Sequence, residues 1–306
     1  MNKKKLTFTG STTRREFISN MSKASAGGLF LLGPFQHAAS QAKTWTVGEI
    51  MDLFIEAATG TPLSETVDTL KSGSRDMEVT GVITTMFATI PVIEYAIEIG
   101  ANFIIPHEPT FYNHVDETDW LEEDDTFQYK LDLLEENGIA IWRNHDYIHR
   151  HQPDGVYSGF LDKLMWKPYV VEESNPRIVE IPEVRLSELI NHVKTRLGIS
   201  MVRYIGDPDQ SCRKILLLPG AMGGQNHIQL VNEHNPDLLM IGEAQEWTTP
   251  EYVRDRRASG KETSLIVLGH ADSEDPGSIY MKDWLLKNVP GVEVTHVHSG
   301  NPFRFG

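Results

Sequence analysis

Histidine and carboxylate residues stand directly behind several apolar segments of this 306-residue sequence. The segment NFIIP is followed by His107 and Glu108, and SLIVLG is followed by His270. Imidazole and carboxylate groups together are ligands for zinc, manganese and iron in proteins. The pattern therefore predicts a metal site to which several segments contribute. The candidate residues are His107, Glu108, His145, His149, Glu243, His270 and Glu274.

The number of these residues indicates two metal ions rather than one. A tetrahedral ion needs four ligands. Two ions about 3.5–4 Å apart can share a bridging group, clamp a substrate oxygen and activate water. His270 and Glu274 are four residues apart, so their side chains face the same way if a helix starts there. We therefore expect two divalent ions: zinc, manganese or iron.

Taken singly, these residues have simpler interpretations. A histidine and a glutamate at a strand end often form a hydrogen-bonded loop pair, and His145 could cap the next segment. His149 and His151 could belong to a solvated polar turn. Only the joint pattern favours a metal site. The other histidines in helical or strand patterns are expected at the surface: His192, His227, His234, His296 and His298.

The segments that must position these residues alternate between strand and helix patterns. Strands are expected within 78–87, 102–106, 139–144, 214–220, 237–243, 264–270 and 291–298. Helices are expected within 46–58, 89–100, 126–138, 155–166, 185–198, 251–260 and 278–288. This alternation predicts an α/β fold with mostly parallel sheets and helices on both faces. Binding sites in such sheets form at the carboxyl ends of strands, where the candidates lie.

The chain is expected to comprise a leader, 1–42, and one metal-binding domain, 43–306, with two lobes. Pro168, Pro176 and Pro182 mark a looser region over 168–182 as the junction of the lobes. The segment PGAMGGQN, 219–226, could approach an anion with its backbone N–H groups, or it could be a plain strand-to-helix turn.

Residues 1–42 have the organisation of a twin-arginine export signal. A basic start precedes STTRREFIS, which contains Arg14 and Arg15, and a short apolar stretch and small residues follow. Such signals export proteins already folded, so we expect a periplasmic or otherwise extracytoplasmic location. A metal loaded before export is not subject to competition from metals outside. Cys212 is the only cysteine, so the fold does not rely on a disulfide there.

The charge and hydropathy of the chain exclude some partners. The net charge is −15, and it becomes −20 without residues 1–42, which carry six basic residues and one acidic residue. Such a chain is an unlikely nucleic-acid binder and suits a cation and a small-molecule substrate better. No apolar run reaches the roughly 18 residues of a membrane span, so none is expected in the mature chain.

Four segments together resemble the Nif-three-like family, also labelled GTP cyclohydrolase I type-two-like. They are VIEYAIEIGANFIIPHEPTFY, LLEENGIAIWRNHDYIHRHQPDGVYSGFLDKL, DLLMIGEAQEW and LIVLGHADSE, in the family's order and spacing. The resemblance covers roughly residues 45–304. It implies an α/β fold, a dinuclear metal centre and a homo-oligomer, often a ring-shaped hexamer. The ligands it implies here are His107, Glu108, His149, His270 and Glu274.

Two of these positions depart from the family's pattern. The family usually has His-His-Pro where this chain has His107, Glu108 and Pro109, and it usually has aspartate at the position of His149. The exchange preserves three histidines and two carboxylates and makes Glu108 the candidate bridging ligand. Alternatively, it destroys one metal position, or Asp146 replaces the missing aspartate.

We therefore expect a metal-dependent hydrolase with an unknown small-molecule substrate. Glu243 or His145 would assist proton transfer, and Glu243 would otherwise support the ligands or face the substrate. The alternative is a non-catalytic metal-binding or scaffold protein with a degenerate centre.

Overall fold

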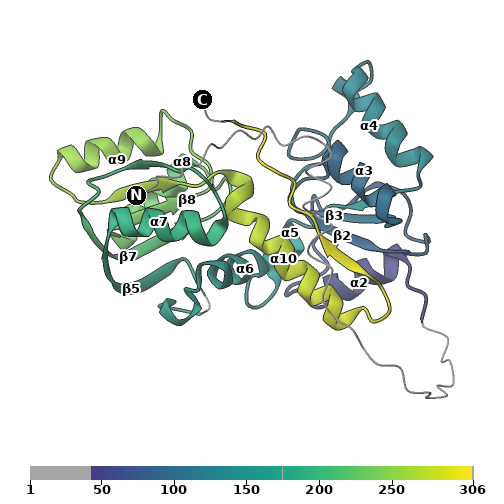
Figure 1. The fold of residues 1–306 in the computed structure, drawn as a ribbon, viewed down its shortest axis with the longest axis horizontal. Coiled ribbons are helices and arrows are strands. Elements are labelled where there is room, and N and C mark those ends of the chain that lie inside the picture. Colours follow the sequence, from purple (N-terminus) through teal and green to yellow (C-terminus); the bar gives the residue numbers. More distant parts are fainter. Residues whose placement is uncertain (1–42, 174, 305–306) are drawn as a thin grey trace, which may run out of the picture. The chain divides into compact units, whose positions relative to one another are not determined.

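The computed structural model describes residues 43–173 and 175–304, which build two five-stranded mixed sheets (Figure 1). The expected export signal at 1–42 lies outside the described residues. The first sheet contains, in spatial order, β1 (Leu70–Ser72), β4 (Ala140–Trp142), β3 (Phe103–Pro106), β2 (Val82–Thr85) and β10 (Val294–His296). Only the β1–β4 pairing in this sheet is antiparallel.

The second sheet contains, in spatial order, β5 (Ile178–Arg185), β7 (Ser211–Leu218), β8 (Leu238–Ile241), β9 (Ser264–Val267) and β6 (Arg203–Ile205). Its three central strands are parallel, and both edge strands are antiparallel to their neighbours. β5 begins inside the region 168–182, so that region is less irregular than its prolines suggested. Pro182 is tolerated because β5 lies at the edge of the sheet.

The helices are α2 (Val47–Glu56), α3 (Ile90–Ile99), α4 (Asp125–Glu136), α5 (Asp146–Arg150), α6 (Gly155–Leu164), α7 (Leu186–Leu197), α8 (Gly224–His234), α9 (Thr249–Ala258) and α10 (His270–Asn288). Short 3-10 turns, η2 (Asp119–Leu121) and η3 (Lys167–Tyr169), separate some of them. Among the described residues, no helix is both long and apolar enough to cross a membrane.

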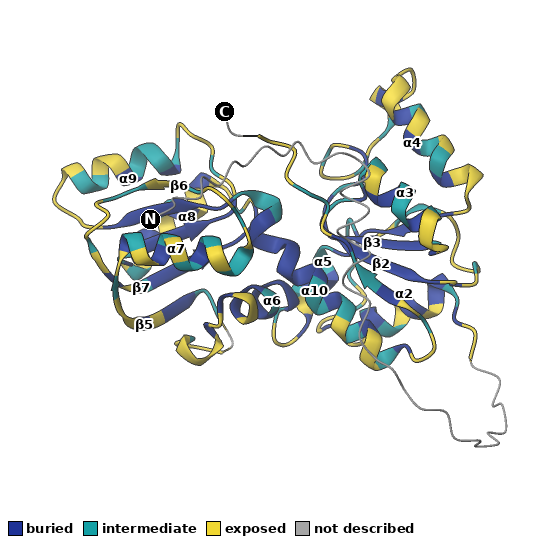
Figure 2. Ribbon diagram, viewed as in Figure 1, coloured by how far each residue is buried: buried dark blue, intermediate teal, exposed yellow. Residues whose placement is uncertain are grey.

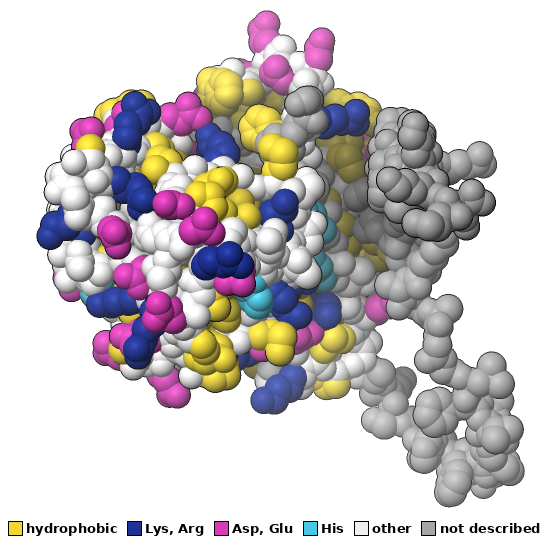
Figure 3. All heavy atoms as spheres, turned by 60° about the vertical axis from the view of Figure 1, so that its left-hand side comes forward, with side chains coloured by type: hydrophobic (Ala, Val, Ile, Leu, Met, Phe, Trp, Pro, Cys, Tyr) yellow, Lys and Arg dark blue, Asp and Glu magenta, His cyan; other side chains and the backbone are white. Residues whose placement is uncertain are grey.

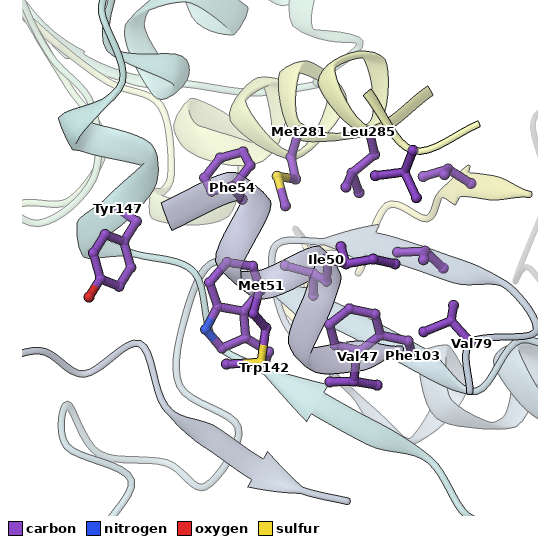
Figure 4. Close-up of a cluster of buried hydrophobic side chains, with 14 of the residues drawn as sticks. Val47, Ile50, Met51, Phe54, Val79, Phe103, Trp142, Tyr147, Met281 and Leu285 are labelled. Atoms are coloured by element: carbon purple, nitrogen blue, oxygen red, sulfur yellow. The ribbon is translucent and has the colours of Figure 1, made fainter. Parts of the chain in front are cut away.

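The strands β2, β3, β4, β8 and β9 are buried along their whole length (Figure 2), as expected of parallel strands covered by helices, whereas the edge strands are partly exposed. On one face of the first sheet, Ile50 and Phe54 of α2 pack with Trp142 of β4 and Leu285 of α10 (Figure 4). The second sheet has α6 and α7 against one face and α8 and α9 against the other. Removing one of the large buried rings would lower the free energy of unfolding by about 3–5 kcal/mol.

Helix α10 leads the chain from the second sheet back to the first (Figure 1). It starts at His270, eight residues before the helix expected over 278–288, and it contains Pro276. The sequence pattern missed this start because a proline inside a helix removes a hydrogen bond and usually ends the helix. The conditional expectation that a helix starts at His270 is confirmed.

Candidate metal centre

The end of β3 fixes His107 and Glu108 through the backbone. Although β3 ends at Pro106, the His107 N–H donates to Thr85 O at 3.1 Å and the Glu108 N–H donates to Met86 O at 2.9 Å. The two residues therefore continue the hydrogen bonding beside β2. Their side chains are buried, with 4% and 7% of the residue surface exposed. A rigid backbone and a buried position leave both side chains little freedom of orientation.

The segment after β4 places two imidazoles one helical turn apart. Asp68 organises the turn, because its carboxylate accepts from the His145 N–H at 2.7 Å and from the Tyr147 N–H at 2.8 Å. Helix α5 then brings the rings of His145 and His149 to a centroid distance of 5.4 Å. The ring of His107 stacks on that of His145 at 4.8 Å and lies 5.4 Å from that of His149.

The start of α10 contributes the remaining candidate ligands. His270 Nε2 lies 3.0 Å from Glu274 Oε2, as the i, i+4 spacing predicted. Glu274 is buried, and the turn between β7 and α8 lies against it. A Cβ atom added to Gly220 would come within 2.3 Å of Glu274 Oε1. The segment 219–226 forms a strand-to-helix turn, and Gly220 allows its close approach to Glu274. Anion binding by the N–H groups of this segment stays a prediction.

All four imidazoles of this cluster have the same orientation. The Nδ1 atom of each is hydrogen-bonded to an oxygen at 2.9–3.1 Å. These oxygens are accepting groups, so Nδ1 carries the proton and Nε2 is left for other contacts. Ligand histidines in metalloproteins have this support, which fixes the tautomer and the ring plane. The pairs are His107 with Asn144 O, His145 with Asp146, His149 with Asp154, and His270 with Glu243.

The Nε2 atoms meet the two carboxylates at the middle of the cluster. Glu108 Oε1 lies 3.3 Å from His270 Nε2 and 3.8 Å from His145 Nε2. Glu274 Oε2 lies 3.6 Å from His107 Nε2. Two sets have ligand atoms all within 4.8 Å of one another: His107 with His145 and His149, and His107 with Glu108 and Glu274.

Arg143 binds the oxygen of Glu108 that does not face the imidazoles. Its guanidinium is fully buried and donates to Glu108 Oε2 at 3.2 Å and to His107 O at 3.3 Å. A third nitrogen donates to His114 O, which fixes the loop after β3. Because Arg143 occupies Oε2, only Oε1 of Glu108 faces the imidazoles. Bridging by Glu108 stays a prediction, and it would have to use this single oxygen.

The titration of these groups reflects their crowding. Burial alone would raise the pKa of Glu108, but the hydrogen bond to His270 and the nearby imidazoles outweigh it and lower the pKa to about 2. Burial opposes charge on His270, yet its hydrogen bonds to Glu108 and Glu274 raise its pKa to about 10. Burial lowers the pKa of His107 to about 4. The carboxylates thus stay charged and attract a cation, as a metal site requires.

The residues present fit divalent metal ions. His107 Nε2 is buried and has no hydrogen-bond partner among the described residues, a costly arrangement that a bound cation would relieve. Four imidazole nitrogens and two carboxylates form the mixed donor set that zinc, manganese and iron accept. All six side chains belong to the carboxyl ends of strands or to the segments that directly follow.

The structure brings the seven predicted site residues together, although their roles stay predictions. His145 is supported like a ligand, through Asp146. Glu243 lies at the edge of the centre, with its side chain 56% exposed and bonded to His270. Sequence reasoning missed Arg143 and Asp154. Arg143 could have been found from the sequence, because it is a charged residue at the end of the apolar run IAIWRN. Asp154 could only have been recognised as a helix cap, from its place before α6.

Three histidines outside the cluster are more buried than the sequence predicted. His227 was expected at the surface, but it is buried, because it lies on the side of α8 that faces α9, where its Nδ1 is 2.9 Å from Thr249 Oγ1. His151 is not in a solvated turn, since it is buried and stacks on Phe54 at 4.0 Å. His296 is partly buried against Asp275.

Comparison with known proteins identifies the family. A family model described as Duf34/NIF3 (NGG1p interacting factor 3) matches residues 46–302. The chain belongs to the Duf34/NIF3 family. A "GTP cyclohydrolase 1 type 2 homolog" of Clostridium perfringens is 26% identical over 251 residues, which are 77% of this chain and 90% of that protein. The Nif-three-like resemblance is thus confirmed.

Solved structures share the Duf34/NIF3 fold at low sequence identity. A hypothetical protein of Staphylococcus aureus has a TM-score of 0.67 at 18% identity, covering 86% of this chain and 100% of that one. A Bacillus cereus protein related to NIF3 has a TM-score of 0.67 at 16% identity, covering 87% and 100%. The predicted α/β class with mostly parallel sheets is therefore confirmed.

Proposed function

We propose that this Duf34/NIF3 protein is an exported, metal-dependent hydrolase with a dinuclear centre and a small-molecule substrate. The observation that supports this proposal is the convergence of three imidazole Nε2 atoms, those of His107, His145 and His270, on two buried carboxylates. The ring of His149 lies beside them, and the Nδ1 atom of each of the four rings is fixed from outside. Two divalent ions in this donor set would polarise a substrate oxygen and activate water near neutral pH.

The residues that would hold the two ions are His107, Glu108, His145, His149, His270 and Glu274. Arg143 keeps Glu108 oriented by donating a hydrogen bond to its Oε2 atom. This arrangement positions the ligands before any ion or substrate arrives, which limits the reorganisation that binding requires.

Two groups at the rim of the centre are suited to proton transfer. Glu243 bonds His270 through Oε2 and has a largely exposed side chain. His114 is exposed, and its ring centroid lies 6.0 Å from that of His145. Because Arg143 holds the His114 carbonyl, the imidazole stays close to the centre. We assign to these two residues the exchange of protons between the reacting groups and solvent.

A small molecule fits this surface better than a nucleic acid. On the face shown in Figure 3, basic and acidic side chains are interspersed without a broad basic patch, and the chain is acidic as a whole. Curated relatives carry the name GTP cyclohydrolase 1 type 2 homolog. The proposed export would separate this protein from cytoplasmic GTP, so we favour another hydrolysable small molecule.

A hydrolysis screen with defined probes tests the proposal. The full-length chain is stripped with a chelator, reloaded with zinc or manganese, and assayed with p-nitrophenyl acetate, p-nitrophenyl phosphate and bis(p-nitrophenyl) phosphate. We expect turnover of at least one probe that requires metal and is lost in Glu108→Ala. Glu56→Ala, which changes an exposed residue of α2, is the matched control. A metal-replete protein that turns over none of the probes would instead support the non-catalytic metal-binding alternative.

A further inference from the structure

Nitrogen donors gather on one side of the metal centre. The ligand atoms of His107, His145 and His149 lie within 4.8 Å of one another, and no carboxylate belongs to this set. The supports of these rings come from Asn144, Asp146 and Asp154, on the outer side. We call these three imidazoles the nitrogen group.

Oxygen donors gather on the other side. Glu274 Oε2 and Glu108 Oε1 lie 3.0 and 3.3 Å from the same atom, His270 Nε2. Glu108 Oε1 lies farther, at 3.8 Å, from His145 Nε2 of the nitrogen group. We call Glu108, Glu274 and His270 the oxygen group. His107 also approaches Glu274, at 3.6 Å, and so lies between the two groups.

The protein enforces this separation. Arg143, fully buried, occupies Oε2 of Glu108 and leaves one oxygen for an ion. The backbone at Gly220 lies so close to Glu274 Oε1 that even a methyl group there would clash at 2.3 Å. Each carboxylate therefore presents one oxygen to His270 Nε2, and rotation of Glu108 toward the nitrogen group would break its buried contact with Arg143.

We propose that the centre is built for two different metals, with zinc or a similar imidazole-preferring ion at the nitrogen group and a harder ion such as manganese at the oxygen group. The physical basis is ligand preference, since imidazole suits zinc and carboxylate suits manganese. The inference rests on the dinuclear centre of the proposed function, and it does not depend on the reaction.

Sequential loading tests this inference without an activity assay. The metal-free full-length chain receives one equivalent of zinc and then excess manganese, and free metal is removed by desalting. We expect about one ion of each metal per chain by elemental analysis. The manganese should give the EPR spectrum of isolated ions, because its neighbour is diamagnetic zinc. Exchange-coupled manganese pairs, or zinc pairs that exclude manganese, would show equivalent positions and overturn the inference.

Two reciprocal substitutions sharpen the test. Glu108→His adds an imidazole to the oxygen group, and we expect manganese retention to fall at least tenfold, with zinc filling both positions when two equivalents are supplied. His149→Asp adds a carboxylate to the nitrogen group, and we expect zinc affinity to fall at least tenfold and manganese pairs to appear. Unchanged loading in both variants would overturn the inference. Glu56→Ala should load as the wild type does.

The outcomes also separate this inference from the proposed function. Segregated metals with no hydrolysis of any probe would leave the inference standing and contradict the hydrolase. Hydrolysis by a protein with two equivalent ions would support the hydrolase and overturn the inference. A chain that binds no metal would overturn both.

Discussion

Two groups of histidines and carboxylates lie at the first turns of α10, and they differ in how their imidazole rings are supported. In the metal centre, Nδ1 of His270 is bonded to Glu243 and Nε2 faces the ligand oxygens. In the second group, which we call the tail cluster (Asp272, Asp275, His296 and His298), Nε2 of His296 bonds Asp275 at 3.2 Å. Nε2 of His298 lies 3.8 Å from Asp272.

The difference shows that composition alone does not make a metal site. Both sets of metal-compatible side chains found among the described residues lie in the metal centre, and the tail cluster supplies none. Its carboxylates form ion pairs with the imidazoles, with Asp275 between His296 and His298. In the metal centre, outer acceptors fix each ring, so several Nε2 atoms face one space.

The largest expected effect is on metal content, and it should distinguish two neighbouring residues of α10. Glu274→Gln removes a ligand, and we expect bound metal to fall from about two ions per chain to one or fewer. Asp275→Asn changes the tail cluster and should leave metal content unchanged. Elemental analysis of both purified variants checks the pair. Equal loss in both would mean that the tail cluster also holds an ion.

Arg143→Gln should produce the next largest effect. Leaving Glu108 buried without its cationic partner should lower the free energy of unfolding of the metal-free protein by about 3–5 kcal/mol. Bound zinc should recover part of this loss, because the ion also neutralises Glu108. Denaturant unfolding with and without zinc measures both quantities. Arg213→Gln, whose partner Glu180 is exposed, should cost about 1 kcal/mol or less.

His227 provides a third arrangement for the comparison. Its Nδ1 bonds Thr249. Among the described residues its buried Nε2 has no partner, as in His107, and no carboxylate is bonded to His227. Burial lowers its pKa to about 4. The unfolded chain therefore binds a proton that the folded chain refuses between pH 6.5 and 4, and stability is lost as the pH falls through this window.

The expected loss through His227 is at most about 3 kcal/mol. His227→Asn should make the free energy of unfolding less steep in pH between 7 and 4 than in the wild type. Urea unfolding across this range measures the slope. An unchanged slope would show that His227 is protonated in the folded protein.

Asp154→Asn should have the smallest of these effects. The substitution weakens the support of His149 Nδ1, and we expect zinc affinity to fall about 10–100-fold. Competition with a chromogenic chelator measures it. Because asparagine also caps helices well, the stability of the metal-free protein should change little. An affinity equal to that of the wild type would argue that His149 is not a ligand.

The sequence predicted the α/β class and the convergence of the seven site residues, because strand ends in parallel sheets meet along one edge. It could not distinguish the metal centre from the tail cluster. That distinction depends on which ring nitrogen finds an outer acceptor, and Asn144 O and Asp154 Oδ2 become acceptors only through the turns that carry them. His227 was placed wrongly because α8 has few apolar residues to reveal its buried side.

The order of strands along the chain constrains when the centre can form. β10 joins β2 at the edge of the first sheet, although the whole second sheet separates them in sequence. During synthesis the first sheet therefore waits for residues 294–296, and His270 and Glu274 emerge long after His107 and Glu108. A nascent chain holds at most four of the six donors until the second sheet has been made. The two-metal centre can therefore be completed only after synthesis of the second sheet, because the earlier chain lacks His270 and Glu274.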